Sequence, residues 1–320
     1  MEAALVAAPR SRPMLPETPQ RRGIFMILWG KQAFRKIVLE PGQTVTFGRT
    51  DRANIVIDDP KMSGLHFSVW FSGKRAVIRD LTFSADGTGE GIAVDGERTT
   101  RGMIEHGGFI VAGETTFQLF LEGFTPAIDA PATLARLGEI EAVKKVLGPV
   151  DGRLYAVMDA ARDEKIRWLL QESVDDHRNL YEGLEGRVLD DVAPYLVRFE
   201  PGSDLLDRLL LGGWGSAWGI FLRSAEVPKE VRRHLRRFLM VQDETSLEKM
   251  YFRFYDPRVL REFAKVVTPR QRAELMVGID RFVLEGDRGE PWAWSASAES
   301  EAADRATAPP EREPSSEGSA

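Results

Sequence analysis

Three residue clusters in the first third of the sequence have side chains suited to binding a phosphate group. They are Gly48-Arg49, Asn54 and Ser63-Gly64-Leu65-His66, and they lie among short apolar runs that are typical of strands. Arginine presents a planar fork of N–H donors, and a serine hydroxyl adds one more short hydrogen bond. An arginine and a serine by themselves are more often a surface ion-pair partner and a turn residue. The surrounding elements must therefore decide between the two interpretations.

Short apolar runs separated by Gly, Asp and Ser continue from residue 23 to residue 123. Turn pairs such as Pro41-Gly42 and Asp95-Gly96 connect them, and no helix-length periodicity interrupts them. This pattern predicts an all-β sandwich. The predicted strands are 24–28, 35–39, 44–47, 54–57, 66–71, 74–80, 92–94, 108–111 and 115–121.

With this spacing, the segment from Arg22 to Glu122 resembles the forkhead-associated (FHA) domain, a β-sandwich that reads phosphothreonine. The resemblance implies two groups of residues. The phosphopeptide-binding group is Arg49, Ser63 and Asp86, and the group that supports the loops is Gly48, Asn54 and His66.

Two positions depart from the pattern of that family. Asp86-Gly87 stands where the family has Asn-Gly, and Gly64 follows Ser63 where a basic or polar residue is frequent. A carboxylate cannot donate the hydrogen bond of an amide, and it adds negative charge beside a phosphate. Both departures favour weaker phosphopeptide binding.

The second half of the chain has a different sequence pattern, in which longer segments with helical periodicity separate the apolar runs. It predicts a linker at 124–150 with a helix at 132–146, and then an α/β or α+β domain at 151–286. The predicted strands are 153–158, 188–198, 219–222 and 251–254. The predicted helices are 163–172, 205–211, 229–240, 246–250, 257–267 and 269–275.

Five segments of this half occur in an order that resembles the effector-adaptor domain of bacterial type VI secretion, a family long catalogued as a domain of unknown function. They are Leu154–Asp159, Leu180–Gly183 with Val192–Val197, Gly213–Gly219, His234–Arg237 and Arg253–Arg258. The resemblance implies a chaperone that holds a toxic effector, loads it onto the VgrG spike protein and is not an enzyme. The motif residues are Asp159, Trp214, Trp218, Arg236, Arg253, Asp256 and Arg258.

The residues of these segments also allow a purely structural interpretation. Trp218 is expected in a packed core, whereas Trp214 is either core or part of a partner groove. Asp256 is expected to cap a helix that Pro257 begins. Arg236 lies beside an apolar helical stripe, where it could pair with Asp256 or Asp159.

Arg253 and Arg258 are open to two roles. Either they join an internal ion-pair network, or they contact an effector directly.

Composition narrows the function further. The chain has 320 residues, no cysteine and a net charge of −6. The segment 287–320 holds eight acids and three arginines, so the rest is nearly neutral and offers no field for nucleic acid or a membrane. Disordered segments are expected at 1–22 and 287–320. No apolar run is long enough to span a bilayer, and the apolar start precedes its arginines, which predicts a cytoplasmic protein.

The sequence shows no complete catalytic or metal-binding motif. The four histidines do not recur at metal-ligand spacing, and Gly215-Ser216-Ala217 lacks the Gly-x-Ser-x-Gly pattern of hydrolases. Asp175-Asp176-His177 looks like a fragment of a metal site, but a solvated surface is the expected role. We therefore expect neither catalysis nor a metal or other cofactor.

The sequence as a whole predicts a two-domain cytoplasmic adaptor. Its partners would be a type VI effector, VgrG and a protein that carries phosphothreonine. The alternative is a phospho-dependent signalling scaffold that carries no effector.

Overall fold

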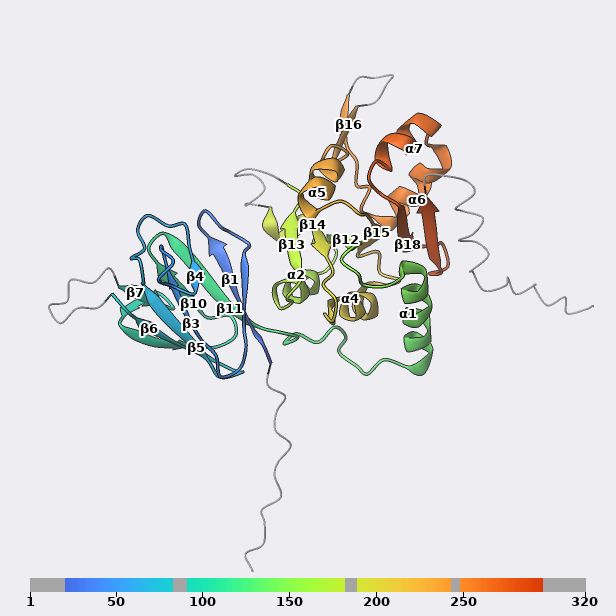
Figure 1. The fold of residues 1–320 in the computed structure, drawn as a ribbon. Coiled ribbons are helices and arrows are strands. Elements are labelled where there is room, and N and C mark those ends of the chain that lie inside the picture. The colour runs from blue at the N-terminus through green and yellow to red at the C-terminus, as the bar shows by residue number, and fades with distance from the viewer. Residues whose placement is uncertain (1–20, 83–90, 182–188, 243–247, 296–320) are drawn as a thin grey trace, which may run out of the picture.

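The computed structural model describes residues 21–82, 91–181, 189–242 and 248–295. An N-terminal β-sandwich is followed by a domain of helices and strands, which confirms the predicted fold class (Figure 1). Among the described residues, no helix is long and apolar enough to cross a membrane.

Two sheets form the sandwich, in the orders β2-β1-β11-β10-β7-β8 and β4-β3-β5-β6-β9. Among the described strands of the sandwich, β3 and β4 pair in parallel and the other pairs are antiparallel. The strands are β1 (Gly23–Trp29), β2 (Lys36–Leu39), β3 (Thr44–Gly48), β4 (Ile55–Val56), β5 (Phe67–Phe71), β6 (Ala76–Asp80), β7 (Ile92–Val94), β8 (Glu97–Thr99), β9 (Arg101–Ile104), β10 (Phe109–Ala112) and β11 (Thr115–Leu121).

Aromatic rings fill the space between the two sheets. Phe47 stacks on Phe67 with ring centroids 4.7 Å apart, and Phe25 stacks on Phe117 at 5.1 Å. Edge contacts of 5.4 to 5.7 Å join the two stacks into one cluster. Offset and edge-to-face pairs of this kind add to the stabilisation that burial itself provides. The cluster lies directly behind β3 and β5. Gly48 is the last residue of β3, and His66 immediately precedes β5.

A six-stranded antiparallel sheet organises the C-terminal domain, in the order β13-β14-β12-β15-β18-β19. All residues of β12 are buried, because helices cover both faces of the sheet. α1, α2 and α4 pack on one face, and α5, α6 and α7 on the other.

The strands of this domain are β12 (Leu154–Asp159), β13 (Asp176–Asn179), β14 (Pro194–Arg198), β15 (Gly219–Arg223), β18 (Arg281–Glu285) and β19 (Pro291–Ser295). β16 (Met240–Gln242) pairs with β17 (Lys249–Tyr251). The helices are α1 (Leu134–Leu147), α2 (Glu164–Gln171), α4 (Leu205–Gly213), α5 (Pro228–Arg236), α6 (Pro257–Val266) and α7 (Pro269–Leu275), with a short 3₁₀ turn, η1 (Asp190–Val192).

Several predicted elements need correction. The helix predicted at 229–240 ends at Arg236, because Met240 pairs with Tyr251 in a small hairpin. Lys249 and Met250 of the predicted helix 246–250 lie in that hairpin, and the strand predicted at 251–254 ends at Tyr251. The strand predicted at 188–198 starts only at Pro194.

The sheet continues past the boundary predicted at 286. β18 and β19 form a hairpin with five paired positions, from Arg281–Ser295 to Glu285–Pro291. Trp294 is fully buried in it, so the first part of the predicted disordered tail belongs to the folded domain. The last residue of the predicted leader, Arg22, also belongs to a folded domain. It forms an ion pair with Glu122, in which Nη2 and Oε1 are 2.6 Å apart.

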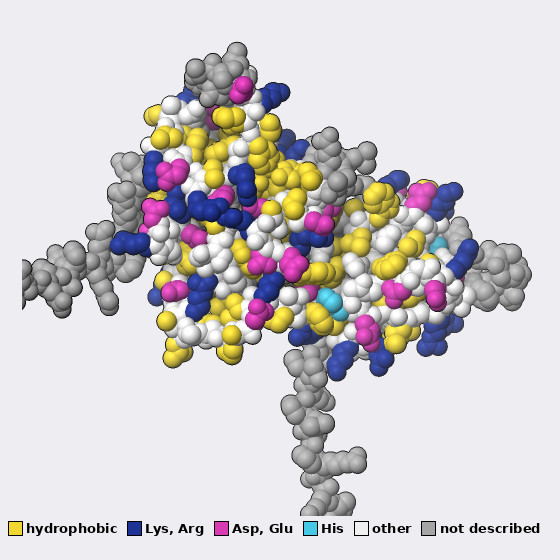
Figure 2. All heavy atoms as spheres, turned by 180° about the vertical axis from the view of Figure 1, so that it is seen from behind, with side chains coloured by type: hydrophobic (Ala, Val, Ile, Leu, Met, Phe, Trp, Pro, Cys, Tyr) yellow, Lys and Arg dark blue, Asp and Glu magenta, His cyan; other side chains and the backbone are white. Residues whose placement is uncertain are grey.

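The two domains are in direct contact. Gly23 to Ile27 are all buried, although residues of a strand alternate between two faces. Phe25 and Ile27 point into the sandwich core, while Ile24 and Met26 pack with Phe120 near Val174 of the C-terminal domain. A second domain therefore covers the outer face of β1. Seen from behind, acidic and basic side chains are interspersed over both domains (Figure 2).

Candidate functional site: the phosphate-type loops and the adaptor motifs

Two loops at one end of the sandwich are joined through their backbones. Arg49 N–H donates to the Ser63 carbonyl at 2.9 Å, and Thr50 donates to the Gly64 carbonyl from its N–H at 3.2 Å and its hydroxyl at 3.0 Å. Gly48 allows this approach, because a Cβ atom there would lie 2.3 Å from the Gly64 carbonyl oxygen. The sequence clusters around Arg49 and Ser63 are thus brought side by side.

His66 is fully buried and links this pair of loops to a third segment. Its Nδ1 accepts the Ser63 N–H at 3.0 Å, which leaves the proton on Nε2 to be donated to the Gly91 carbonyl, also at 3.0 Å. The His66 carbonyl accepts the Leu81 N–H at 2.8 Å. His66 therefore braces the loops and does not lie at the surface, as the resemblance implies for its role.

Arg49 is exposed at the end of the sandwich. Its Nε donates to the Met62 carbonyl at 3.0 Å, which fixes the side chain along the loop that carries Ser63. Within the described ranges no carboxylate pairs with Arg49, so its terminal nitrogens are not engaged by an acidic side chain. Ser63 is half-buried beside it, and Asp86 lies outside the described residues.

The side chains of Asn54 and Asp59 stabilise the same end of the sandwich through hydrogen bonds. The Asn54 amide oxygen accepts from the Thr46 N–H at 2.9 Å and from the Thr46 hydroxyl at 2.8 Å. Asp59, which sequence reasoning missed, accepts from the backbone of Lys61 and Glu114 and from the Thr115 hydroxyl. Burial alone would raise the pKa of Asp59, but these three hydrogen bonds outweigh burial and lower it.

Both tryptophans of the segment 213–219 lie in the core of the C-terminal domain. Trp214 and Trp218 are each 5% exposed, and the Trp214 indole N–H donates to the Gly289 carbonyl at 2.7 Å. Trp218 packs against Gly213, as its expected core position requires. The partner groove considered for Trp214 is thereby ruled out.

The loop between the two tryptophans is held by Glu285 of β18. This buried carboxylate accepts the N–H of Gly215 at 2.8 Å and of Ala217 at 3.2 Å. Burial raises the pKa of Glu285, against the opposing effect of the backbone N–H groups. Ala217 has a φ of 54°, so the loop adopts a left-handed turn that the carboxylate fixes in place.

Asp159 and Asp256 are the acidic members of an internal ion-pair network. Asp159 is 1% exposed and pairs with Arg253, while Asp256 pairs with Arg258 at 2.7 Å. Asp256 also caps α6 through the backbone N–H of Arg258 at 3.0 Å, with Pro257 at the first helical position. Both arginines thus form ion pairs within the domain, but their side chains stay 42% and 57% exposed, so direct contact with an effector remains open.

Arg236 does not pair with either carboxylate. Its Nε donates to the Leu180 carbonyl at 2.8 Å, and Arg232, one helical turn away, donates to the Asn179 and Tyr181 carbonyls. Asp256 is instead reached by Arg162, 3.6 Å from Oδ2. Helical spacing relates only residues that are close in the chain, so it could not predict that Asp159 pairs with Arg253 or that Asp256 lies near Arg162.

Comparison with protein families assigns both halves. A family model described as "FHA domain" matches residues 45–113, and one described as "Domain of unknown function (DUF4123)" matches residues 154–274. The chain contains an FHA domain and a DUF4123 domain. No curated protein matches the chain.

Several solved FHA-type structures are similar to part of the chain. The FHA domain of CT664 from Chlamydia trachomatis is 22% identical, with 31% of this chain and 96% of that chain covered and a TM-score of 0.28. The FHA domain of a hypothetical protein from Arabidopsis thaliana is 22% identical, with coverages of 36% and 92% and a TM-score of 0.28. A structure from a study of phosphothreonine-dependent FHA domain interactions is 19% identical, with coverages of 32% and 99% and a TM-score of 0.27.

A polar junction between the FHA and DUF4123 domains was missed by sequence reasoning. The Lys36 ammonium of the FHA domain donates to the carbonyls of Leu170, Ser173 and Asp175, at 2.7, 2.6 and 2.6 Å, and so caps the C-terminal end of α2. Asp175 and His177 are buried here, which corrects their expected place on a solvated surface.

Glu172 forms the second half of the junction. This fully buried carboxylate accepts the N–H and the hydroxyl of Thr125, both at 2.6 Å, and lies 3.6 Å from His106 of the FHA domain and from Arg208 of α4. Burial lowers the pKa of His106, against the attraction of Glu172. The segment that connects the domains is thus fastened along α2 and α4.

Proposed function

We propose that this protein is a cytoplasmic adaptor that works by binding other proteins and not by catalysis. Its DUF4123 domain holds a type VI secretion effector and presents it to the VgrG spike protein. Its FHA domain recruits a partner that carries phosphothreonine. Neither activity needs a cofactor, nucleic acid or a membrane.

The observation that carries the phosphothreonine part is the position of Arg49. Its exposed guanidinium lies beside Ser63 on loops that His66 and the paired backbones hold rigidly. A phosphate accepts several short, charge-assisted hydrogen bonds from such a fork, and a rigid site avoids the entropy cost of ordering a loop on binding. Proteins similar to this domain have been solved in work on phosphothreonine-dependent interactions.

The effector-binding part rests on the resemblance of five ordered segments to the effector-adaptor domain, in a region where the DUF4123 model also matches. The motif residues Asp159, Asp256, Trp214 and Trp218 are buried and engaged with partners inside the domain. They therefore specify the fold, and cargo would be held by the surface that this fold presents. Buried carboxylates that are already paired with arginines are poorly placed for acid–base catalysis.

Calorimetry with a phosphothreonine peptide tests the FHA site. Arg49→Ala is expected to weaken binding at least tenfold, because it removes a charge-assisted contact of about 1.5–3 kcal/mol. Arg52→Ala is the matched control, since Arg52 is an exposed arginine of the same loop, and it should retain affinity. Equal affinity of the Arg49 variant and the parent protein, or equal binding of the unphosphorylated peptide, would refute the assignment.

A further inference from the structure

The outer face of the sheet β4-β3-β5-β6-β9 has two parallel rows of side chains. The strand registers place Thr46, Ser68, Arg79 and Arg101 in one row across β3, β5, β6 and β9. They place Thr44, Trp70, Val77 and Met103 in the next row. One row therefore ends in two cations, and the other is largely apolar.

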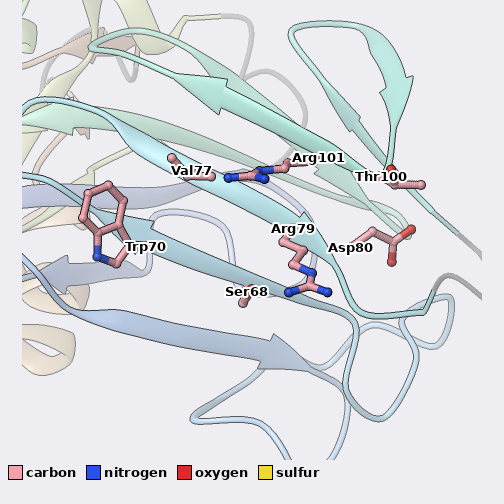
Figure 3. A pocket seen from close by; sticks show the side chains of 7 residues that line it. All are labelled: Ser68, Trp70, Val77, Arg79, Asp80, Thr100 and Arg101. Atoms are coloured by element: carbon pink, nitrogen blue, oxygen red, sulfur yellow. The ribbon is translucent and has the colours of Figure 1, made fainter.

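This face is hollowed and accessible. A depression of about 570 Å³ lies on this face, and Figure 3 shows the side chains that line it: Ser68, Trp70, Val77, Arg79, Asp80, Thr100 and Arg101. Trp70 is 43% exposed and Met103 is 49% exposed. Large apolar side chains that share a depression with cations are a typical feature of binding surfaces.

The two arginines are cross-strand neighbours, and Figure 3 shows the Arg101 side chain extending toward Val77 and that of Arg79 toward Ser68. Arg79 and Arg101 are directly opposite across β6 and β9, and like charges in this arrangement destabilise a sheet. In the part of the chain that the structure describes, neither guanidinium has an acidic partner. The nearby Asp80 is buried, and its carboxylate accepts from the N–H and the hydroxyl of Thr82, both at 2.7 Å. An incoming anion would relieve the repulsion.

We propose that this outer sheet face is a second protein-binding surface, whose ligand is an extended partner segment with an acidic and a large apolar side chain two residues apart. Along β5, β6 and β9 the two rows are separated by two residues, or about 7 Å. Residues i and i+2 of an extended peptide have the same separation. A carboxylate can then reach Arg79 and Arg101 while its neighbour covers Trp70.

Two other occupants fit less well. A second copy of this face would bring four arginines together, which is electrostatically unfavourable. Residues 296–320 of this chain supply six acids but no aromatic residue and no Val, Leu, Ile or Met, so they match one row only. The charge and the apolar row together favour a partner protein.

This surface is independent of the proposed phosphothreonine site. Arg49 and Ser63 do not line the depression, and the ligand needs no phosphate. The two sites can therefore fail or succeed separately in experiments.

Fluorescence titration of the full-length chain tests the proposal with a synthetic peptide that repeats Glu-Thr-Leu-Thr. The parent protein should bind this peptide. Two matched peptides, one with Lys in place of Glu and one with Ser in place of Leu, should bind at least tenfold more weakly. The double variant Arg79→Gln, Arg101→Gln and the single variant Trp70→Thr should each lose at least tenfold in affinity. The thermal midpoint of the double variant should not fall, and should rise slightly because two like charges are removed, which shows that the sheet is folded.

Matched controls come from the other domain. Arg270→Gln removes an exposed arginine, and Trp168→Gln removes a tryptophan that is also 43% exposed, so neither should alter binding. A chain that ends at Ser295 should bind the peptide with the same affinity. Tighter binding by the shortened chain would show that residues 296–320 occupy the sheet face in the full-length chain. Equal binding of the lysine peptide would show that the arginines do not select an acidic ligand. Either result overturns the proposal.

Discussion

Small residues and buried polar groups decide whether the exposed Arg49 is usable. Gly48 contributes no functional group, but its missing side chain lets two loops meet at backbone distance. His66 contributes two hydrogen bonds from a fully buried position. The proposed phosphate contact of Arg49 therefore depends on Gly48 and His66, which a ligand would not touch, and changes at these two residues should act through the position of the loops.

Gly48→Ala should impair phosphopeptide binding although Arg49 is intact. The new methyl group would lie 2.3 Å from the Gly64 carbonyl oxygen, which is backbone and cannot rotate away. We expect a loss of about 1–3 kcal/mol in the free energy of unfolding of the sandwich. Gly64→Ala is the control, because its methyl group would meet the Thr50 hydroxyl at 3.0 Å, a side chain that can move. Urea unfolding and calorimetry of the two variants should rank them in that order; the reverse ranking would contradict this account of the loops.

At the scale of elements, the DUF4123 domain fixes its turns with side chains from distant strands. The clearest case is Glu285 on β18, which holds the loop between Trp214 and Trp218. Buried N–H groups that lose their acceptor cost free energy, since water cannot replace the lost bond. This connection couples the last hairpin of the domain to the loop after α4.

Glu285→Ala should therefore destabilise the DUF4123 domain by about 2–4 kcal/mol, because it leaves the N–H groups of Gly215 and Ala217 without their acceptor. The tryptophan emission spectrum should shift at the same time, as Trp214 and Trp218 gain access to water. Glu274→Ala, which removes an exposed carboxylate on α7, should change neither quantity. An unchanged unfolding midpoint for Glu285→Ala would show that the carboxylate does not hold the loop.

Local patterns explain what could be predicted from the sequence. Alternating apolar residues identified the inner strands such as β5 and β6, because each buries one face in the ring cluster. The edge strands β8 and β13 were missed, since Glu97–Thr99 and Asp176–Asn179 contain no apolar alternation. Asp256 was recognised as a cap because a cap is local, whereas the Asp159–Arg253 pair joins residues far apart in the chain.

At the scale of the whole molecule, the two domains are joined by a polar contact as well as by apolar packing. Part of the Lys36 chain is accessible, but its ammonium nitrogen is enclosed by three carbonyl oxygens of the DUF4123 domain. Burial lowers the pKa of Lys36 to about 7, although Asp175 and Asp176 act to raise it and Arg178 adds to the lowering.

The docking of the two domains should become more favourable as the pH rises from about 7 to about 10.5. In the separated domains Lys36 has its ordinary pKa of 10.5, so in this window the separated form binds more protons than the docked form. Below pH 7 both forms are protonated, and this dependence disappears. Energy transfer between labels at Lys74→Cys and Arg270→Cys, introduced into this cysteine-free chain, reports the docked fraction.

Lys36→Met is the control for that titration. It should abolish the pH dependence and, below pH 7 where the Lys36 ammonium donates to three carbonyls, weaken docking by about 2–4 kcal/mol. Lys31→Met removes an exposed lysine of the same domain and should leave the titration unchanged. A Lys36 variant that titrates like the parent chain would exclude this lysine as the cause.

The central claim is that two binding domains in one chain hold separate partners. Its most direct test is to purify the tagged full-length chain, and separately its Arg49→Ala variant, from cells that make the protein naturally. Both should retain a secreted effector together with VgrG, and only the parent chain should retain a threonine-phosphorylated protein. Recovery of neither effector nor VgrG with either chain would contradict the account.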